Sequence, residues 1–125
     1  MPIDATQPYD DQNVFAKVLR NEIPSKRVYE DEFAVAFHDI NPQAPTHLLV
    51  IPRKPYVSWD DFTAKASDAE IAGVMRAIGH VAREAGLVAP GYRLLVNIGQ
   101  HGHQEIAHLH IHIFAGRPLG AMLPR

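Results

Sequence analysis

The chain has 125 residues and a mass of 13.9 kDa, which is enough for one domain with its own hydrophobic core. Twelve Lys and Arg residues against fourteen Asp and Glu residues give a formal net charge of -2, which argues against long nucleic acids as partners. With no cysteine and no apolar run of the ~18 residues that a membrane span needs, the sequence predicts a cytoplasmic protein without disulfides, thiolate metal sites or membrane partners.

The first elements in chain order are a polar arm and a short helix. Residues 1–12 are polar, include two prolines and show no periodicity, so we expect a flexible N-terminal arm ahead of a single domain over residues 13–125. Asn13 is a suitable N-cap, and the apolar residues after it recur at helical spacing. They predict a short helix that ends near Asn21 and carries an apolar stripe of Val14, Phe15, Val18 and Leu19.

Strands are expected next. Residues 27–29 and 33–38 flank an acidic turn, and large apolar residues alternate with small ones in the second segment, which indicates a β-hairpin. After a proline-bearing loop, residues 47–52 form a continuous apolar run bounded by prolines. Such a run is typical of a central strand that is buried on both faces.

The most regular pattern in the chain is that of a long helix. Ser67 and Glu70 have the spacing of a capping box, and apolar residues then recur at helical spacing from Ile71 to Ala85. Gly86 follows the last of them, as in a Schellman C-terminus. Met75 and Ile78 on this helix are candidate contacts to a second copy of the chain.

Two more strands are expected at residues 92–97 and 107–114, separated by a loop rich in Gly and His at residues 99–106. The elements then follow the order helix, hairpin, strand, helix, strand, strand. Short turns between strands favour a mainly antiparallel, five-stranded sheet with two helices on one face. The predicted fold class is therefore α+β.

Histidines occupy every second position of the last predicted strand. Because successive side chains alternate between faces, His108, His110 and His112 share one face while Leu109 and Ile111 share the other. Neighbouring histidines are then about 6.6 Å apart and the outer two about 13 Å, too far for all three to bind one zinc ion at ~2.1 Å. For any single histidine, an amphipathic strand with an incidentally polar face is the simpler alternative.

The chemistry of imidazole favours a reaction at this face. A neutral imidazole nitrogen is a nucleophile near neutral pH, and neighbouring groups on the same face can orient it. The glycine-containing loop at residues 99–106 supplies backbone N–H groups that suit anionic oxygens. Together these features indicate attack at a phosphorus centre.

The sequence His-Leu-His-Ile-His-Ile-Phe at residues 108–114 resembles the signature of the histidine triad superfamily, in which histidines alternate with apolar residues. The similarity includes residues 37–40, 42–52 and 116–123, and it is greatest to bacterial members of the nucleotide-binding branch. It extends over about residues 14–123. The resemblance implies the HIT-like fold, in which the five-stranded sheet is extended across a homodimer.

The resemblance assigns roles to four histidines and one carboxylate. His110, the middle histidine, would attack the α-phosphorus of a nucleotide, and water would then release the monophosphate from the covalent intermediate. His112 would contact phosphate oxygens, while His108 and His47 would support the middle ring and tune its protonation. Asp39 would accept hydrogen bonds from the ribose hydroxyls.

The resemblance also implies where the base and the leaving group bind. Asn97 and Gln104 would reach the phosphate or the leaving group. His103 stands where relatives usually have glycine, and Glu105 where animal relatives have a serine that bonds the leaving group, so both bear on leaving-group choice. The purine slot would consist of residues that by themselves indicate only core packing, namely Val14, Phe15, Val18 and Phe37, beside Ile40.

These features predict a homodimeric purine nucleoside phosphoramidate hydrolase that acts on AMP or GMP derivatives and needs neither a metal nor another cofactor. A dinucleoside polyphosphate hydrolase would use the same nucleophile, but residues 116–123 resemble the phosphoramidate branch. A nucleotide-binding regulatory module with little turnover is a second alternative. A metal-binding protein is favoured only by the local density of histidine.

Overall fold

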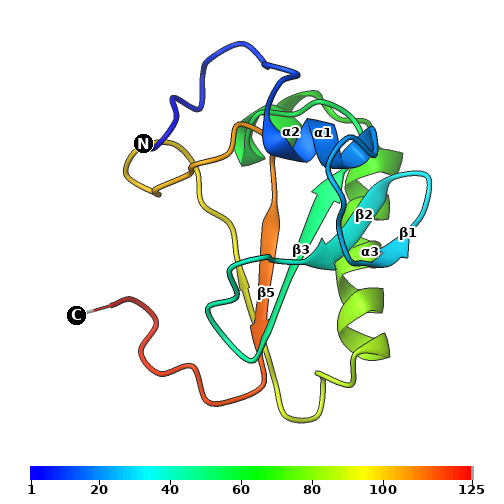
Figure 1. The fold of residues 1–125 in the computed structure, drawn as a ribbon, viewed down its shortest axis with the longest axis vertical. Helices are drawn as coiled ribbons and strands as arrows, with labels where there is room; N and C mark the ends of the chain where they lie inside the picture. Colours follow the sequence, from blue (N-terminus) through cyan, green and yellow to red (C-terminus); the bar gives the residue numbers. More distant parts are fainter. Residues whose placement is uncertain (125) are drawn as a thin grey trace.

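The computed structural model describes residues 1–124, which form one antiparallel sheet and three helices (Figure 1). The sheet order is β1-β2-β3-β5-β4. The helices are α1 (Val14–Leu19), α2 (Trp59–Lys65) and α3 (Asp68–Glu84), and the strands are β1 (Arg27–Glu30), β2 (Ala34–His38), β3 (Thr46–Pro52), β4 (Arg93–Leu95) and β5 (Ile111–Ala115). The predicted α+β fold is confirmed, and within residues 1–124 no helix is long and apolar enough to cross a membrane.

Helix α3 begins and ends as its sequence predicts. The Ser67 hydroxyl accepts a hydrogen bond from the N–H of Glu70, and the Glu70 carboxylate accepts one from the N–H of Ser67, so the capping box is complete. At the other end, Gly86 has a φ of 71° and the N–H of Leu87 donates to the carbonyl of Ala82, as in a Schellman motif.

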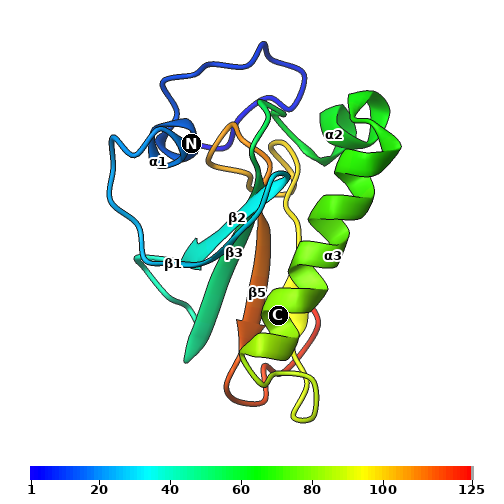
Figure 2. The same cartoon turned by 90° about the vertical axis from the view of Figure 1, so that its right-hand side faces the viewer.

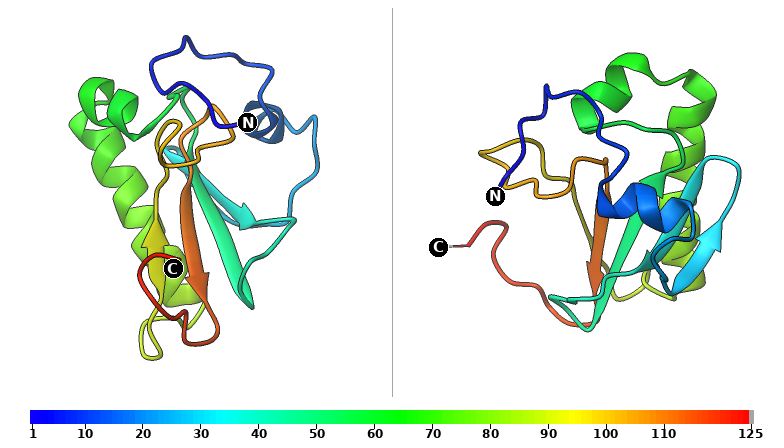
Figure 3. Two further views of the ribbon diagram at one scale, coloured as in Figure 1. Left: turned by 90° about the vertical axis from the view of Figure 1, so that its left-hand side faces the viewer. Right: turned by 45° about the horizontal axis from the view of Figure 1, so that its top comes forward.

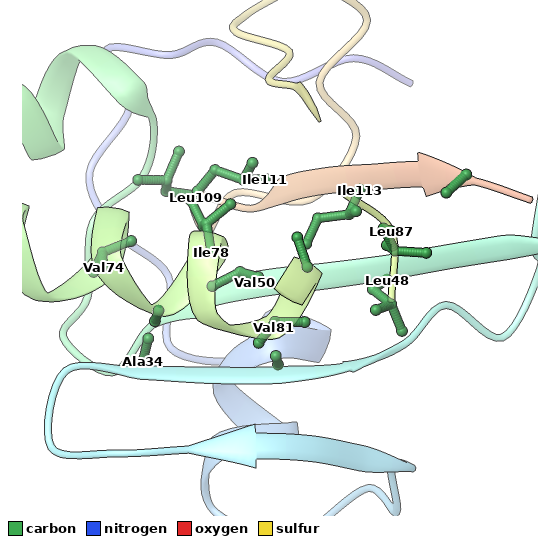
Figure 4. Close-up of a cluster of buried hydrophobic side chains, with 14 of the residues drawn as sticks. Ala34, Leu48, Val50, Val74, Ile78, Val81, Leu87, Leu109, Ile111 and Ile113 are labelled. Carbon is green, nitrogen blue, oxygen red and sulfur yellow. The ribbon is translucent and has the colours of Figure 1, made fainter. Parts of the chain in front are cut away.

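One face of the sheet, which we call the α3 face, shares a hydrophobic core with α3 (Figure 4). Its members come from strands and helix alike and include Ala34, Leu48, Val50, Ile111, Ile113, Val74 and Val81. Ile78 is only 5% exposed within this core, and Met75 packs against it. This burial argues against a contact of Ile78 with a second copy, and the predicted contact of Met75 stays a prediction.

The opposite face of the sheet, the α1 face, is covered by α1. Phe15 and Val18 of α1 form a second core with strand residues Val35, Phe37, Leu49 and Ile51. Figure 2 shows α1 and α3 on opposite sides of the strands. The prediction of two helices on one face is wrong in this respect, since the apolar stripe of α1 is buried on the other side of the sheet.

The pairing of β3 with β5 determines which residues reach the α1 face. Leu49 pairs with His112 and His47 with Phe114, so these four side chains lie on the same face. This is the face opposite the isoleucines of β5, as the alternation in the sequence predicts.

Strand β5 begins later than predicted. Its regular ladder starts at Ile111, because the N–H of Leu109 donates instead to the carbonyl of Tyr56 at 2.8 Å, outside the sheet. His108 and His110 therefore lie in an irregular segment just before the strand. Both residues are nevertheless buried.

The structure adds a helix, α2, that the sequence pattern did not indicate. Ser58 caps it by accepting a hydrogen bond from the N–H of Asp61. Phe62 is its buried residue and joins the core of the α3 face. A helix of seven residues with one core side chain is too short to reveal a 3.6-residue period.

Residues 1–12 run along the domain (Figure 3). The N–H of Ile3 donates to the carbonyl of Gln104 at 2.7 Å, and the Tyr9 hydroxyl bonds to Nδ1 of His108 at 2.6 Å. The division into an arm and a domain over residues 13–125 stays a prediction. These contacts nonetheless place the arm beside the histidines.

Candidate active site

A cavity of about 390 Å³ opens on the α1 face, and we call it the histidine pocket. It brings together most of the predicted site residues, namely Val14, Phe15, Val18, Phe37, Asp39, Ile40, Asn97, His103, Glu105, His110 and His112. Three further predicted residues, His47, His108 and Gln104, are buried in the protein interior. The sequence did not single out other residues of the wall, namely Ile23, Pro24, Ser25, His38, Asn41, Gln43, Leu49 and Ile106.

His110 is held as a neutral imidazole with one free nitrogen. Its Nδ1–H donates to the backbone carbonyl of His108 at 2.8 Å, which leaves the lone pair of the neutral ring on Nε2. Burial lowers the pKa of His110, against smaller opposing effects of the His108 carbonyl and Asp39. The ring meets Phe15 edge-on, with centroids 4.9 Å apart. A neutral imidazole with a free lone pair on Nε2 is the state that a nucleophile requires.

His112 receives a hydrogen bond that sets its tautomer. The N–H of Gln43 donates to Nδ1 of His47 at 3.1 Å, so a neutral His47 carries its proton on Nε2. This Nε2–H donates to Nδ1 of His112 at 2.9 Å, and the proton of His112 is then on its own Nε2. His47 was expected to support the middle ring, but this hydrogen bond directs it to His112 instead.

The resulting donor suits an anionic oxygen. Burial, with smaller contributions from His110 and His47, lowers the pKa of His112 to about 4, against the opposing effect of Asp39. A neutral His112 with Nε2–H in the wall of the pocket can donate to a phosphate oxygen without carrying a charge of its own. The predicted role of His112 in phosphate contact therefore agrees with its hydrogen bonding.

Asp39 lies directly after β2 with its carboxylate in the wall of the pocket. One carboxylate oxygen accepts a hydrogen bond from the N–H of Asn41 at 2.8 Å, and the other lies 3.4 Å from Nε2 of His47. These contacts fix an acceptor between the histidines and the apolar slot. Such an acceptor suits a hydroxyl-bearing ligand.

The side chain of His108 is turned away from its predicted partner. Nε2–H donates to the carbonyl of Pro52 at 2.9 Å, and Nδ1 accepts from the Tyr9 hydroxyl at 2.6 Å. Burial lowers the pKa of His108 to about 4, opposed by the Pro52 carbonyl and reinforced by His110. His108 therefore supports His110 through its backbone carbonyl, which agrees with the support of the middle ring that was expected of this residue.

Gln104 holds the loop together and does not reach toward a phosphate. Its side chain is 1% exposed, and its amide group donates to the carbonyls of Val57 at 2.7 Å and Ile106 at 3.0 Å. Its amide oxygen accepts from the N–H of Gly99 at 3.1 Å. Because these bonds occupy the side chain, the predicted contact between Gln104 and the leaving group is wrong for this arrangement.

His103 and Glu105 stand at the exposed rim of the pocket. Their side chains pair, with Nε2 of His103 2.8 Å from Oε1 of Glu105. His103 has a φ of 59°, a conformation that glycine adopts without strain, which explains why glycine suits this position. The rim pair therefore presents both an acidic group and an imidazole at the wall of the histidine pocket.

One cluster has the residue types of a metal site. Ligand atoms of Asp39, His47 and His112 lie within 4.8 Å of one another. The N–H of Gln43, however, occupies Nδ1 of His47, so a metal on Nε2 would require an anionic imidazole or loss of that bond. The cluster is better arranged for the hydrogen bond between the two rings.

The family described as HIT domain matches residues 20–119. The chain is 42% identical over 113 residues to the purine nucleoside phosphoramidase of Escherichia coli K12, covering 90% of this chain and 94% of that protein. It is 62% identical over 117 residues to an uncharacterized HIT-like protein of Azospirillum brasilense, covering 94% and 96% respectively. A solved histidine triad protein from Clostridium difficile has a TM-score of 0.78 and 41% identity, covering 88% of this chain and 95% of that chain.

The buried neutral histidines predict a loss of stability in mild acid. In the unfolded chain His108 and His112 have their usual pKa of 6.5, and burial lowers the folded pKa of each to about 4. Between these values the unfolded state binds more protons, so stability falls as the pH decreases through this range. Thermal unfolding followed by circular dichroism should give a constant Tm above pH 7 and a falling Tm below about 6.5.

Two variants test the origin of this pH dependence. His112→Asn removes a half-buried imidazole whose pKa is lowered and should make the acid-induced fall in Tm shallower. His101→Asn removes an exposed one and should leave the fall unchanged. A Tm that stays constant from pH 7 down to pH 4 would contradict the neutral buried state of these rings.

Proposed function

The chain belongs to the HIT domain family, and from this premise we propose that it hydrolyses purine nucleoside 5′-phosphoramidates to nucleoside 5′-monophosphates. The observation that carries the proposal is the free Nε2 of neutral His110 in a pocket with an apolar slot on one side and the donor His112 on the other. The name of the Escherichia coli relative, purine nucleoside phosphoramidase, supports the substrate class.

In the first step Nε2 of His110 attacks the phosphorus. The P–N bond breaks, its electron pair leaves with the amine, and water supplies the proton that the amine needs. In the second step the remaining hydroxyl of water attacks the phosphorus and breaks the bond to Nε2. One water is consumed in total, and His110 returns to its neutral state with the proton still on Nδ1.

The groups around His110 favour these two reaction steps. His112 donates from Nε2–H to an oxygen of the phosphoryl group, where charge increases in the transition state. Asp39 accepts from the ribose hydroxyls, and the base lies between α1 and β2. The slot consists of Val14, Phe15, Val18, Phe37 and Ile40.

Replacement of His110 by Ala tests the nucleophile. Turnover of adenosine 5′-phosphoramidate should fall about 10³-fold or more, while the affinity for AMP changes far less, because the variant keeps the slot and loses the attacking atom. His112→Ala should be milder, since it removes charge stabilisation only. Steady-state assays and calorimetry on the same samples measure both quantities, and His101→Ala is the matched control.

A rapid-quench experiment with labelled substrate identifies the intermediate. The adduct should be labile in acid, stable in base and located on His110, and turnover should persist in a chelator. Label on another residue, or near-normal turnover of His110→Ala, would show that the nucleophile is misassigned.

Asp39→Ala tests the ribose contact. Loss of a charge-assisted hydrogen bond should weaken AMP binding by about 1 to 2 kcal/mol, or roughly 5- to 30-fold, by calorimetry. Asp39→Asn retains an oxygen for the N–H of Asn41 but not the charge, so it should fall between the wild type and the Ala variant. Unchanged AMP affinity in Asp39→Ala would remove Asp39 from the site.

We further propose that two copies pair through β4. This strand is at the edge of the sheet and is short, and its Leu94 is 48% exposed. The opposite edge, β1, carries the charged residues Arg27 and Glu30, which protect it from pairing. The one charged residue of β4, Arg93, donates to the carbonyls of Gly120 and Ala121, and the rest of the strand is leucine. Such an edge is suited to an isologous interface that continues the sheet.

Sedimentation equilibrium should give about twice 13.9 kDa for the wild-type chain. Leu94→Lys places a charge on the edge of β4 and should shift the mass toward the monomer. Val28→Lys is the matched control, because Val28 is 47% exposed on the opposite edge strand. A monomeric wild type at micromolar concentration, or equal effects of the two variants, would contradict pairing through β4.

A further inference from the structure

The N-terminal arm contacts the most deeply buried histidine through one hydroxyl. Nε2–H of His108 donates to the carbonyl of Pro52 at 2.9 Å, so its Nδ1 carries no proton in the neutral ring and needs a donor. The Tyr9 hydroxyl supplies that donor at 2.6 Å, from a position 99 residues away in the chain. Burial raises the pKa of Tyr9 and lowers that of His108, which keeps Tyr9 protonated as donor and His108 neutral as acceptor.

The backbone of His108 in turn orients His110. Its carbonyl accepts from Nδ1–H of His110 at 2.8 Å. This carbonyl lies before the start of β5, where the next N–H, that of Leu109, bonds to Tyr56 and not to β3. Since the β3–β5 ladder does not extend to this peptide, it is held by the hydrogen bond from the N–H of Leu109 to Tyr56 and by the contacts of the His108 side chain.

The arm is fixed at two points around this contact. The N–H of Ile3 donates to the carbonyl of Gln104 at 2.7 Å, and Asn13 caps α1 by accepting from the N–H of Ala16. Figure 1 shows the arm passing from the loop before β5 to α1. The ring of Tyr9 meets that of His108 edge-on between these points, with centroids 5.6 Å apart.

We propose that Tyr9 is a positioning residue for the nucleophile: its hydroxyl fixes the orientation of His108, whose carbonyl aligns His110. This inference rests on the proposed function, in which His110 attacks phosphorus. Without the hydroxyl, Nδ1 of His108 is a buried acceptor with an unmet hydrogen bond, so the ring reorients and the peptide carrying the carbonyl shifts. A nucleophile displaced by a fraction of an ångström reacts more slowly although the substrate still binds.

The test is Tyr9→Phe, which keeps the ring and removes only the hydroxyl. With adenosine 5′-phosphoramidate, kcat should fall on the order of tenfold, while KM and the calorimetric affinity for AMP stay within about twofold. Tyr29→Phe is the matched control, because it removes a hydroxyl that donates to Asp31 at 2.7 Å in the β1–β2 hairpin. It should leave kcat unchanged.

Nuclear magnetic resonance of the histidine nitrogens tests the same proposal without a reaction. In the wild type the proton should be on Nε2 of His108 and on Nδ1 of His110, and Tyr9→Phe should shift the Nδ1 resonance of His108 and mix the tautomers of His110. A purely structural tyrosine would lower Tm and leave kcat and the tautomers unchanged, which would overturn the proposal. If His110→Ala retains turnover, the proposed function fails, and the tautomer measurement alone decides whether Tyr9 positions His110.

Discussion

The hydrogen bond from Nδ1–H of His110 to the carbonyl of His108 determines what the histidine pocket can do, because it leaves Nε2 as a free lone pair. A regular strand would direct backbone carbonyls into its ladder and leave fewer of them for side chains. The late start of β5 is therefore a requirement of the site. Tyr56 makes it possible by accepting the N–H of Leu109, which would otherwise remain unpaired in the interior.

Buried imidazoles impose a second constraint, since each neutral ring has one donor and one acceptor that must both be matched. Gln43 begins one series of hydrogen bonds, in which its N–H determines the tautomer of His47, and His47 determines the tautomer of His112. Tyr9 begins another, which fixes the ring of His108. In the first series a donor from outside the sheet determines the tautomer of His112, whereas the Pro52 carbonyl determines that of His108 and Tyr9 completes its hydrogen bonding. The low pKa values of His108 and His112 follow mainly from burial, and their fixed tautomers follow from these hydrogen-bond partners.

The sequence predicted those features that depend on neighbouring residues and on a regular spacing of side chains. Alternation predicted the shared face of His110 and His112, and helical spacing with Ser67 and Gly86 predicted α3 with both of its ends. The contact of Tyr9 with His108 joins residues 99 apart and leaves no periodic signal. The sequence pattern around a glutamine such as Gln104 is also the same whether the side chain faces a ligand or bonds to backbone groups of its own loop and of Val57. The contact of Tyr9 and the role of Gln104 were therefore the parts of the site that the sequence predicted least well.

The hydrophobic core and the histidine pocket depend on the same strand register. Because β3 pairs Val50 with Ile111 and Leu49 with His112, the isoleucines of β5 enter the core of the α3 face and the histidines enter the pocket. A slip of one residue would exchange the two faces and place imidazoles in the α3 core, where apolar side chains offer them no hydrogen bonds. The alternative register is thus disfavoured by the core and by the site together. The free energy gained by burying the isoleucines therefore also stabilises the register that directs the histidines into the pocket.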